Sequence, residues 1–497
     1  MAAMHDVIGS LGGGQIFCLI LALLMALTFE FVNGFHDTAN AVATVIYTHS
    51  LPPSVAVVWS GIWNLLGVLR STGTVAFAII SLLPFELVTN VGSAAGFAMV
   101  FSLLISAIIW NLGTWYLGLP ASSSHTLIGS IMGVGLMNSI LTTGGISGGV
   151  NWGKAREVGV TLLVSPVVGF VCAAILLLLV KALIRKPELY SAPDPTKAPP
   201  IWIRGLLCLT CTGVSYAHGS NDGQKGIGLL MLILVGIIPG MYSLDLSTKA
   251  DSIHQLTVMS QSAGTNFQKH AIGAPLDKDG STKVLAAYLK SGADFTDNVY
   301  SALVEKNQEI ATTLAGQKSL SELPETKRSE LRSAIYSTSE TIGKLTKSKK
   351  VTGDEAASLT SYKSALDKTT KFIPIWVKFA VAFALGLGTM IGWKRIVVTV
   401  GEKIGKTHLT YAQGACAEMV AMITIGLADT YGLPVSTTHV LSSGVAGTMA
   451  ANKSGLQMST LRNLLLAWVL TLPVCVFLGA AFFAAGLRLI ARIFGLH

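Results

Sequence analysis

The chain has 497 residues, of which 51% are hydrophobic and only 12% are charged, and its mean hydropathy is +0.60. Soluble globular proteins carry about 25% charged residues, so this composition excludes a soluble enzyme and indicates a membrane protein. The formal net charge is +9. The sequence nevertheless contains no basic segment interleaved with aromatic residues, so nucleic acid is not an expected partner.

Charge is unevenly distributed along the chain. Residues 243–371 hold 17 of the 35 Lys and Arg and 15 of the 26 Asp and Glu, so this segment is polar and nearly charge-balanced. Helical patterns such as the one from Thr326 to Thr346 predict that it is a water-soluble helical insert. The six cysteines lie in apolar runs, where a thiol behaves as a small hydrophobe. We therefore expect no disulfide framework and no bound cofactor.

Apolar stretches long enough to cross about 30 Å of hydrocarbon recur along the chain. They lie at 16–33, 54–70, 95–117, 159–183, 201–218, 226–242, 373–393, 411–431 and 464–491. Two further stretches, 119–141 and 433–450, are rich in Gly and Ser and begin at a Leu-Pro pair. Loops with several Lys and Arg, at 181–204 and 394–406, are expected on the cytoplasmic side.

An internal repeat organises these stretches. Residues 118–125 read GLPASSSH and recur at 432–439 as GLPVSTTH, with five of the eight positions identical. A looser pair consists of GFHDTANA at 34–41 and GSNDGQKG at 219–226. The two motifs occur in the same order in each part of the chain, so the sequence predicts two equivalent halves.

The spacing of the motifs places the insert in the second half. The looser pair superposes Asp37 on Asp222. Asp37 and Pro120 are 83 residues apart, whereas Asp222 and Pro434 are 212 residues apart, and the difference of 129 is the length of the insert. The expected organisation is an N-terminal membrane repeat (1–184), a basic linker (185–200), the start of the C-terminal membrane repeat (201–242), the polar insert (243–371) and the remainder of that repeat (372–497).

The two halves are predicted to be inverted relative to one another. Segment 41–53 is too short and polar to span, so we interpret it and its counterpart 226–242 as re-entrant arms of broken helices. The residues after Gly73 and the amphipathic segment 394–405 are interpreted as interfacial helices. Each half then crosses the membrane five times, an odd number, which places both termini and the insert outside. An all-α polytopic protein with inverted repeats and broken helices is typical of secondary transporters.

Two acids lie at equivalent places in the repeat, each in apolar surroundings. Ionisable groups at membrane depth are costly and usually line a substrate or ion pathway, so Asp37 and Asp222 are candidates for coupling to cations or protons. A single motif of this kind would also fit a loop at the membrane interface, but its recurrence favours a functional role. The amides Asn40 and Asn221 stand close by in the sequence and are candidate substrate ligands.

The two Leu-Pro segments are predicted to begin new helices. Proline ends the preceding element, and the Ser/Thr run can cap a helix whose first N–H groups have no partners. Such a helix end is a ready anion site, and two facing each other would enclose an oxyanion, although a locally satisfied cap would explain one copy. The candidate substrate ligands are Ser122, Ser123, Ser124, Ser436, Thr437 and Thr438.

An anion site that contains two carboxylates repels its ligand unless cations enter with it. This conflict argues for cation-coupled symport, with histidines as candidate proton carriers because they titrate near neutrality, although each one also suits helix packing. The coupling candidates are His36, Asp37, His125, His218, Asp222, Lys225, Glu418 and His439. Glu30 also lies in an apolar span.

A membrane-embedded hydrolase that uses Ser123 or Ser124 with His125 is the enzymatic alternative. Such an enzyme needs one nucleophile activated by one oriented base, whereas the Ser/Thr cluster is duplicated in the two halves. Duplication favours binding over catalysis, so we expect no enzymatic activity.

The paired signatures resemble the PiT inorganic phosphate transporter family, and residues 34–48 and 217–228 resemble its bacterial low-affinity Pit type. The resemblance covers the whole membrane part. It implies a multi-pass protein of the bacterial inner membrane that imports inorganic phosphate by proton symport, with phosphate carried as a neutral complex with a divalent metal such as magnesium, calcium or zinc. By position it assigns to the site Asp37, Asn40, Asn221, Asp222 and the hydroxyls of residues 122–124 and 436–438. Glu418 matches a functional acid of sodium-coupled members.

Departures from the family pattern bear on coupling. Sodium-coupled members resemble Gly-Ala-Asn-Asp-x-Ala-Asn in both halves, whereas here His36 precedes the first acid, and Gln224 and Lys225 stand where Ala and Asn would follow the second. An ammonium in a cation position favours protons over sodium.

The expected partners are inorganic phosphate, protons and the lipid bilayer. A sodium-coupled phosphate permease or a sulfate permease of the same superfamily is the alternative. Sulfate carries no proton to donate at neutral pH, so carboxylate acceptors favour phosphate. The residues leave open whether a metal accompanies the phosphate, whether the protein is a homodimer, and what Arg70 does.

Overall fold

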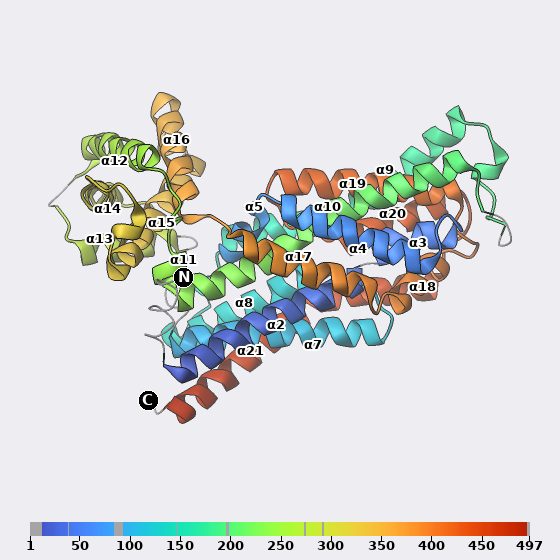
Figure 1. Cartoon of the computed structure of the whole chain (residues 1–497), viewed down its shortest axis with the longest axis horizontal. Coiled ribbons are helices and arrows are strands. Elements are labelled where there is room, and N and C mark those ends of the chain that lie inside the picture. Colours follow the sequence, from blue (N-terminus) through green and yellow to red (C-terminus); the bar gives the residue numbers. More distant parts are fainter. Residues whose placement is uncertain are drawn as a thin grey trace.

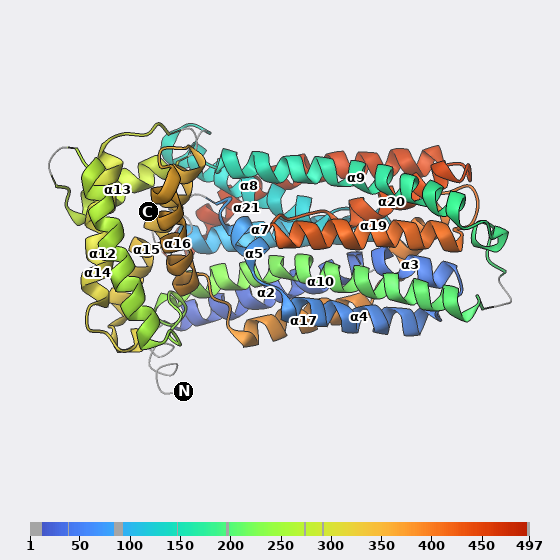
Figure 2. The ribbon, with the colours of Figure 1, turned by 90° about the horizontal axis from the view of Figure 1, so that it is seen from above.

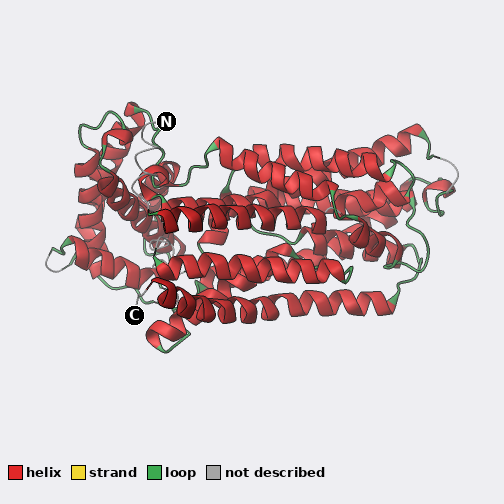
Figure 3. Ribbon diagram, turned by 60° about the horizontal axis from the view of Figure 1, so that its bottom comes forward, coloured by secondary structure: helices red, strands yellow, loops and turns green. Residues whose placement is uncertain are grey.

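The computed structural model describes residues 12–37, 39–83, 93–146, 148–194, 198–272, 275–290 and 293–494. Within these residues all regular structure is helical, apart from one isolated bridge between Gly405 and Leu456 (Figure 3). A long helical bundle forms most of the molecule, and a smaller group of helices, α12 to α16, lies at one end of it (Figure 1).

The bundle contains two series of helices. The first comprises α2 (Gly13–Asp37), α3 (Ala39–Tyr47), α4 (Pro53–Arg70), α5 (Thr74–Ile80), α7 (Ala94–Tyr116), α8 (Ser123–Thr143) and α9 (Trp152–Leu183). The second comprises α10 (Ile201–Ile237), α11 (Pro239–Tyr242), α17 (Ile375–Met390), α18 (Lys394–Glu402), α19 (Tyr411–Thr430), α20 (Thr437–Ala451) and α21 (Met458–Phe494). Six described helices are long and apolar enough to cross a membrane, or eight if two bent pairs count as one span each.

The predicted break in the second half is wrong. Segments 201–218 and 226–242 are not two arms, because α10 runs unbroken through the polar residues between them and only the short α11 follows. The polar side chains in this run are paired with groups from other helices, so they need no break in the helix to be satisfied. In the first half, α2 and α3 together cover Gly13–Tyr47, and 41–53 supplies the end of this span and a turn instead of a re-entrant arm.

The two helix series make equivalent contacts. Helix α2 packs on α17 and α4 packs on α10, while α8 packs on α21 and α20 packs on α9. Small residues allow these close approaches, since a Cβ atom on Gly133 would lie 2.0 Å from the carbonyl oxygen of Val476, and one on Gly447 would lie 2.2 Å from that of Phe170. The last helix of each series therefore packs on a helix of the other series.

The first helices of the two series run in opposite directions. The span of α2 and α3 starts near the α12 to α16 group and ends at the far end of the bundle, whereas α10 starts at the far end and returns to α11 (Figures 1 and 2). Both ends of the described chain lie near the α12 to α16 group, and the connection between α9 and α10 lies at the opposite end with α18.

The polar insert forms a helical unit around its own apolar core. Its helices are α12 (Ala250–His270), α13 (Lys278–Leu289), α14 (Asn298–Leu314), α15 (Glu325–Lys347) and α16 (Gly353–Thr370). Leu303 and Tyr362 are among the side chains buried in this core. Helix α15 also contacts α11, and the ammonium of Lys347 lies 3.7 Å from a carboxylate oxygen of Glu157 in the bundle.

Two apolar cores fill the bundle, one toward the insert and one toward the far end. The first includes Leu19, Leu127 and Ile233, and the second includes Val42 and Leu441. The buried polar residues in the middle of α10 and at the starts of α8 and α20 lie between these cores. This polar layer is therefore buried in the middle of the bundle, away from both of its ends.

Candidate functional site

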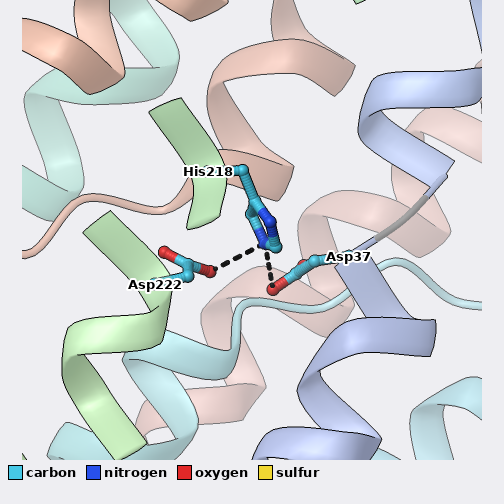
Figure 4. A group of neighbouring side chains, drawn as sticks. All are labelled: Asp37, His218 and Asp222. Atoms are coloured by element: carbon cyan, nitrogen blue, oxygen red, sulfur yellow. Dashed lines mark ion pairs between the residues drawn. The ribbon is translucent and has the colours of Figure 1, made fainter. Parts of the chain in front are cut away.

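Two carboxylates and an imidazole form the centre of the buried polar layer (Figure 4). Asp37 is the last residue of α2, and His218 and Asp222 lie one turn apart in the middle of α10. The Nε2 atom of His218 is 3.2 Å from Asp222 Oδ2 and 3.7 Å from Asp37 Oδ2, and all three side chains are at most 3% exposed. One ligand atom from each residue lies within 4.8 Å of the others, so the three groups could bind one cation together.

Lys225 adds a buried positive charge to this centre. Its Nζ atom lies 2.8 Å from Asp222 Oδ2 and donates a hydrogen bond of 2.9 Å to the hydroxyl of Ser123. The Lys225 side chain is fully buried. Because an isolated ammonium is costly to bury, its pairing with a carboxylate is what makes this position tolerable.

The two Leu-Pro segments begin helices at the predicted residues. Ser122 caps α8 by accepting a hydrogen bond from the N–H of His125, and Ser436 caps α20 in the same way with His439. Gly118 and Gly432 precede these segments with φ angles of 67° and 66°, a left-handed conformation that suits glycine after a helix end. The two Leu-Pro segments therefore share the same local geometry.

Hydroxyl groups at the starts of α8 and α20 hold the two carboxylates. Ser123 donates to Asp37 Oδ2 at 3.0 Å and Thr437 donates to Asp222 Oδ2 at 3.3 Å, while Thr438 donates to Asp37 Oδ1. Asp37 from the first series thus accepts hydrogen bonds from hydroxyls of both Leu-Pro segments. Two helix N-termini, whose dipoles favour negative charge, meet at the acid pair.

The two Leu-Pro segments also contact each other and α10 directly. The Ser124 hydroxyl donates to the carbonyl oxygen of Val435 at 2.9 Å, so the start of one helix is fastened to the loop before the other. The Asn221 amide donates to the carbonyl oxygen of Leu433 at 3.2 Å. The side chain of Asn40 lies outside the part of the chain that the structure describes.

The predicted proton carriers do not share one location. His36 is hydrogen-bonded at 3.0 Å to Thr114. The rings of His125 and His439 have centroids 4.7 Å apart, and His439 stacks on Trp468 at 4.1 Å. Of the histidines that the structure describes, His218 is the one whose ring lies within 4 Å of the two carboxylates.

Glu418 occupies a separate buried position on α19. Its two carboxylate oxygens accept hydrogen bonds from Thr44 on α3 and Thr210 on α10. These contacts link three helices of the two series around one acid. Glu418 is therefore a second buried carboxylate outside the Asp37 and Asp222 centre.

Three residues near the centre were not identified as site candidates from the sequence alone. The Oδ1 atom of Asn64 accepts a hydrogen bond of 2.7 Å from Nδ1 of His218, and Asp429 accepts hydrogen bonds from Ser220 at 2.6 Å and Gln224 at 2.5 Å. Glu30 packs against α10, where a Cβ atom on Gly226 would lie 2.2 Å from its Cγ. An amide or acid within an apolar stretch is the signal that could have identified Asn64 and Asp429.

The three residues of the centre are buried in the bundle between two cavities. A cavity of about 900 Å³ lies toward the insert and one of about 590 Å³ lies toward the far end, beside α3 and α18. Asp37, His218 and Asp222 line neither of these two cavities. The arrangement encloses a charged centre between two openings.

The contacts do not assemble a hydrolase. Ser123 donates to a carboxylate and Ser124 donates to a backbone carbonyl, and the ring of His125 lies 4.7 Å, centroid to centroid, from that of His439. A nucleophilic serine requires a base within hydrogen-bond reach that accepts its proton, and the described residues place no imidazole in that position.

Comparisons with known proteins point to one family. A profile of the Phosphate transporter family matches residues 33–479. The low-affinity inorganic phosphate transporter PitB of Escherichia coli (strain K12) is 43% identical over 493 residues, which cover 95% of this chain and 97% of that protein. PitA of the same strain is 42% identical over 490 residues, with the same coverage.

A more distant relative and a solved structure extend the comparison. The low-affinity inorganic phosphate transporter of Buchnera aphidicola subsp. Acyrthosiphon pisum is 41% identical over 486 residues. A solved structure of a sodium-dependent phosphate transporter matches 94% of this chain and 98% of its own chain, with a TM-score of 0.51 and 19% identity, a likeness that shows the fold alone. A polytopic helical chain with this buried centre, matched along nearly its whole length, belongs to the Phosphate transporter family.

Proposed function

We propose that this chain imports inorganic phosphate across the bacterial inner membrane as a secondary transporter. In the proposed mechanism phosphate moves together with protons, as a neutral complex with a divalent metal ion, and the site opens to the two sides in turn. The names of the E. coli relatives support phosphate as the substrate. The observation that carries the proposal is the buried centre in which two carboxylates, a histidine and a lysine meet two helix N-termini.

Charge balance at this centre supports coupling to cations. With Asp37 and Asp222 ionised and Lys225 protonated, the centre carries one net negative charge when His218 is neutral. A phosphate anion entering this environment would meet repulsion at short range, which is costly where water is excluded. A proton on His218, or a metal ion held by Asp37, His218 and Asp222, removes that repulsion.

The ligand types bear on which metal would accompany the phosphate. Carboxylate oxygens suit magnesium and calcium, whereas an imidazole nitrogen beside carboxylates also suits zinc and manganese. Asp222 is paired with Lys225, so a metal entering the centre competes with the ammonium for the same carboxylate oxygen. The proposal therefore includes displacement of Lys225 from Asp222 when the loaded metal complex binds.

The helix arrangement supports alternating access through two inverted repeats. The first helices of the two series run in opposite directions, equivalent helices make equivalent contacts, and the centre lies between two cavities at opposite ends. Architectures of this kind work by moving one repeat against the other around a fixed site. The basic loops lie at the end opposite the insert, which supports an insert on the periplasmic side.

The composition of the centre also argues against two alternatives, namely sulfate as the substrate and sodium as the coupling ion. Sulfate lacks a proton to donate to the carboxylates at neutral pH, so the acid pair favours phosphate. Sodium is disfavoured because a monovalent ion is attracted to Asp222 less strongly than a divalent metal is, and so competes less well with the ammonium of Lys225, which lies 2.8 Å from that carboxylate. Both arguments rest on residues of this chain. The sodium-dependent transporter of similar fold is 19% identical and bears on the fold alone.

Uptake of radiolabelled phosphate into proteoliposomes tests the proposal. We expect uptake that is driven by an imposed proton gradient, stimulated by magnesium and resistant to excess sulfate. Asp37→Asn and Asp222→Asn should each reduce uptake to background without loss of membrane insertion. Asp251→Asn, which neutralises an exposed acid at the start of α12, serves as the matched control and should transport normally. Near-normal uptake by either centre variant would contradict the proposed site.

A further inference from the structure

The larger cavity, of about 900 Å³, lies between the insert and the bundle and is strongly basic. Eight Lys or Arg side chains and three carboxylates line it. Most of the basic groups come from α15, α16 and the residue after α16, and they include Arg332, Lys344, Lys368 and Lys371. The insert thus contributes most of the charge of this cavity.

The three carboxylates are already paired with part of the basic groups. Glu157 lies 2.9 Å from the ammonium of Lys154 and 3.7 Å from that of Lys347. Asp367 lies 2.6 Å from Lys363, and Lys371 lies 3.1 Å from both Asp367 and Glu340. A surplus of positive charge therefore remains in the cavity after every lining carboxylate is paired.

Arg332 carries part of this surplus at a protected position. Its Nε atom is buried and makes no hydrogen bond with any residue that the structure describes, and its guanidinium lies 5.7 Å from the ring centroid of Tyr336. In the described chain no carboxylate lies within 4 Å of Arg332 or Lys368, and the Lys344 ammonium donates to the carbonyl oxygen of Tyr288 at 2.5 Å. A guanidinium with a buried Nε atom and no described acid within 4 Å has donors left over, and its planar donors fit phosphate oxygens.

The floor of the cavity leads toward the transport centre. It is formed by Thr72, Thr74, Tyr431 and Gly432, and Gly432 begins the Leu-Pro segment of α20. The Thr74 hydroxyl donates to the carbonyl oxygen of Asp429 at 3.4 Å. The Asp429 side chain in turn accepts from Ser220 and Gln224, which neighbour the centre residues Asn221 and Lys225. Asp429 thus links a residue that lines the cavity to residues of α10 that are adjacent in sequence to the centre.

We propose that this basic cavity is a peripheral binding site that captures inorganic phosphate and supplies it to the transport centre. The inference rests on the proposed function and gives the insert a role, namely to build an electropositive entrance on the periplasmic side. Fields from charges of one sign in a concave site raise the local concentration of the opposite ion and its rate of entry by about 10 to 1,000 times.

Phosphate oxygens could reach the cavity from solution or from the headgroup of an anionic lipid at the edge of the bundle. The same basic groups would recognise both, so the experiment has to separate them. Vesicles of phosphatidylcholine alone and vesicles with added phosphatidylglycerol provide the two arms.

The test compares kinetics of variants that remove equal charge inside and outside the cavity. Arg332→Gln with Lys368→Gln neutralises two cavity groups, whereas Lys283→Gln with Lys318→Gln neutralises two exposed groups elsewhere on the insert. In phosphatidylcholine vesicles at low ionic strength, the cavity variant should raise the KM for phosphate at least threefold with an unchanged maximal rate. The difference should shrink at about 0.5 M salt, where charges are screened beyond a few ångströms. The control pair should leave the KM unchanged.

Each result has a defined meaning. An unchanged KM in the cavity variant would overturn the proposal, whereas failure of the unmodified protein to take up phosphate would instead overturn the proposed function. A KM difference seen only with phosphatidylglycerol would assign the cavity to lipid headgroups and overturn capture from solution.

A second variant and a binding measurement guard against misfolding. Lys347→Gln with Lys368→Gln alters only exposed side chains of the same cavity and should raise the KM in the same direction. Equilibrium dialysis of radiolabelled phosphate with the Asp222→Asn protein should detect binding that Arg332→Gln with Lys368→Gln removes. Equal binding with and without the cavity changes would contradict the proposal even if uptake cannot be measured.

Discussion

Under the proposed proton coupling, replacing Lys225 by Gln is expected to give a transporter that responds to sodium. Lys225 places its ammonium 2.8 Å from Asp222 Oδ2 and 2.9 Å from the Ser123 hydroxyl, at a fully buried position. These two oxygens are the kind of ligands that bind a hard monovalent cation. With an amide in place of the ammonium, the oxygens would remain while the resident positive charge would be gone.

The magnitude follows from the distances. At an effective dielectric constant of 20, the Lys225 ammonium and the Asp222 carboxylate attract each other by about 6 kcal/mol at 2.8 Å. A sodium ion about 4 Å from the ammonium would be repelled by about 4 kcal/mol, which lowers its affinity roughly a thousandfold. Removal of the charge restores that affinity, and Asp222 keeps its contacts with His218 and Thr437.

The assay is uptake of radiolabelled phosphate by proteoliposomes under an imposed sodium gradient at constant pH, together with binding of radioactive sodium to the purified protein. The unmodified protein and Lys225→Arg, which keeps the positive charge, should bind no sodium and respond only to the proton gradient. Lys225→Gln should bind sodium. A correctly folded Gln variant without sodium binding, or a sodium response in the unmodified protein, would refute the reasoning.

Three further predictions concern packing, pH and orientation. Gly133→Ala should destabilise the protein by about 1 to 3 kcal/mol in thermal unfolding, because its Cβ would lie 2.0 Å from a carbonyl oxygen of α21, whereas Gly113→Ala, with nothing within 4 Å, should not. Burial opposes ionisation of Asp367, but Lys371 and a neighbouring ammonium lower the pKa of its carboxyl. The stability it contributes is therefore complete above about pH 4 and is lost as the pH falls through the folded-state value; unfolding curves of Asp367→Asn should show a smaller loss in acid. Lys318→Cys, exposed on the insert, should react with an impermeant thiol reagent outside intact cells after the native cysteines are replaced, and labelling only after permeabilisation would reverse the proposed orientation.

The span positions and helix starts were accessible to sequence reasoning because they depend on local signals. The apolar stretch predicted at 54–70 is α4, Pro53–Arg70, and the Leu-Pro segments begin helices capped by Ser122 and Ser436. Apolar run length, proline and serine all act within a few residues of the feature they determine.

The continuity of α10 could not be read locally. A run of Asn, Asp, Gln and Lys resembles a break when its partners are unknown, and those partners come from distant helices. The Gln224 amide bonds to Asp429 and the Lys225 ammonium bonds to Ser123, contacts that span 205 and 102 residues of sequence. The long-range pairing satisfies the polar groups and removes the reason for the helix to break.

The repeat indicated candidate site residues but not which of them lie together in the structure. Asp37 and Asp222 occupy equivalent sequence positions, and the structure brings both to one histidine. His125 and His439 are equally equivalent, yet their rings contact each other in a tilted arrangement with centroids 4.7 Å apart. Both pairs of equivalent positions thus lie close together, while the direction of each side chain depends on packing that a motif does not encode.

The exchange of packing partners between the two helix series has a consequence for biogenesis. Helix α8 begins at the hydroxyls that hold the acid pair, and its partner α21 is made much later in synthesis. Roughly 300 residues separate the end of α8 from the start of α21, so at about 5 to 20 residues per second the ribosome takes roughly 15 to 60 s to supply that partner. The growing chain must wait in the bilayer with the small-residue face of α8 uncovered. A product truncated before α21 lacks the helix on which α8 packs, so we expect it to form no active transporter.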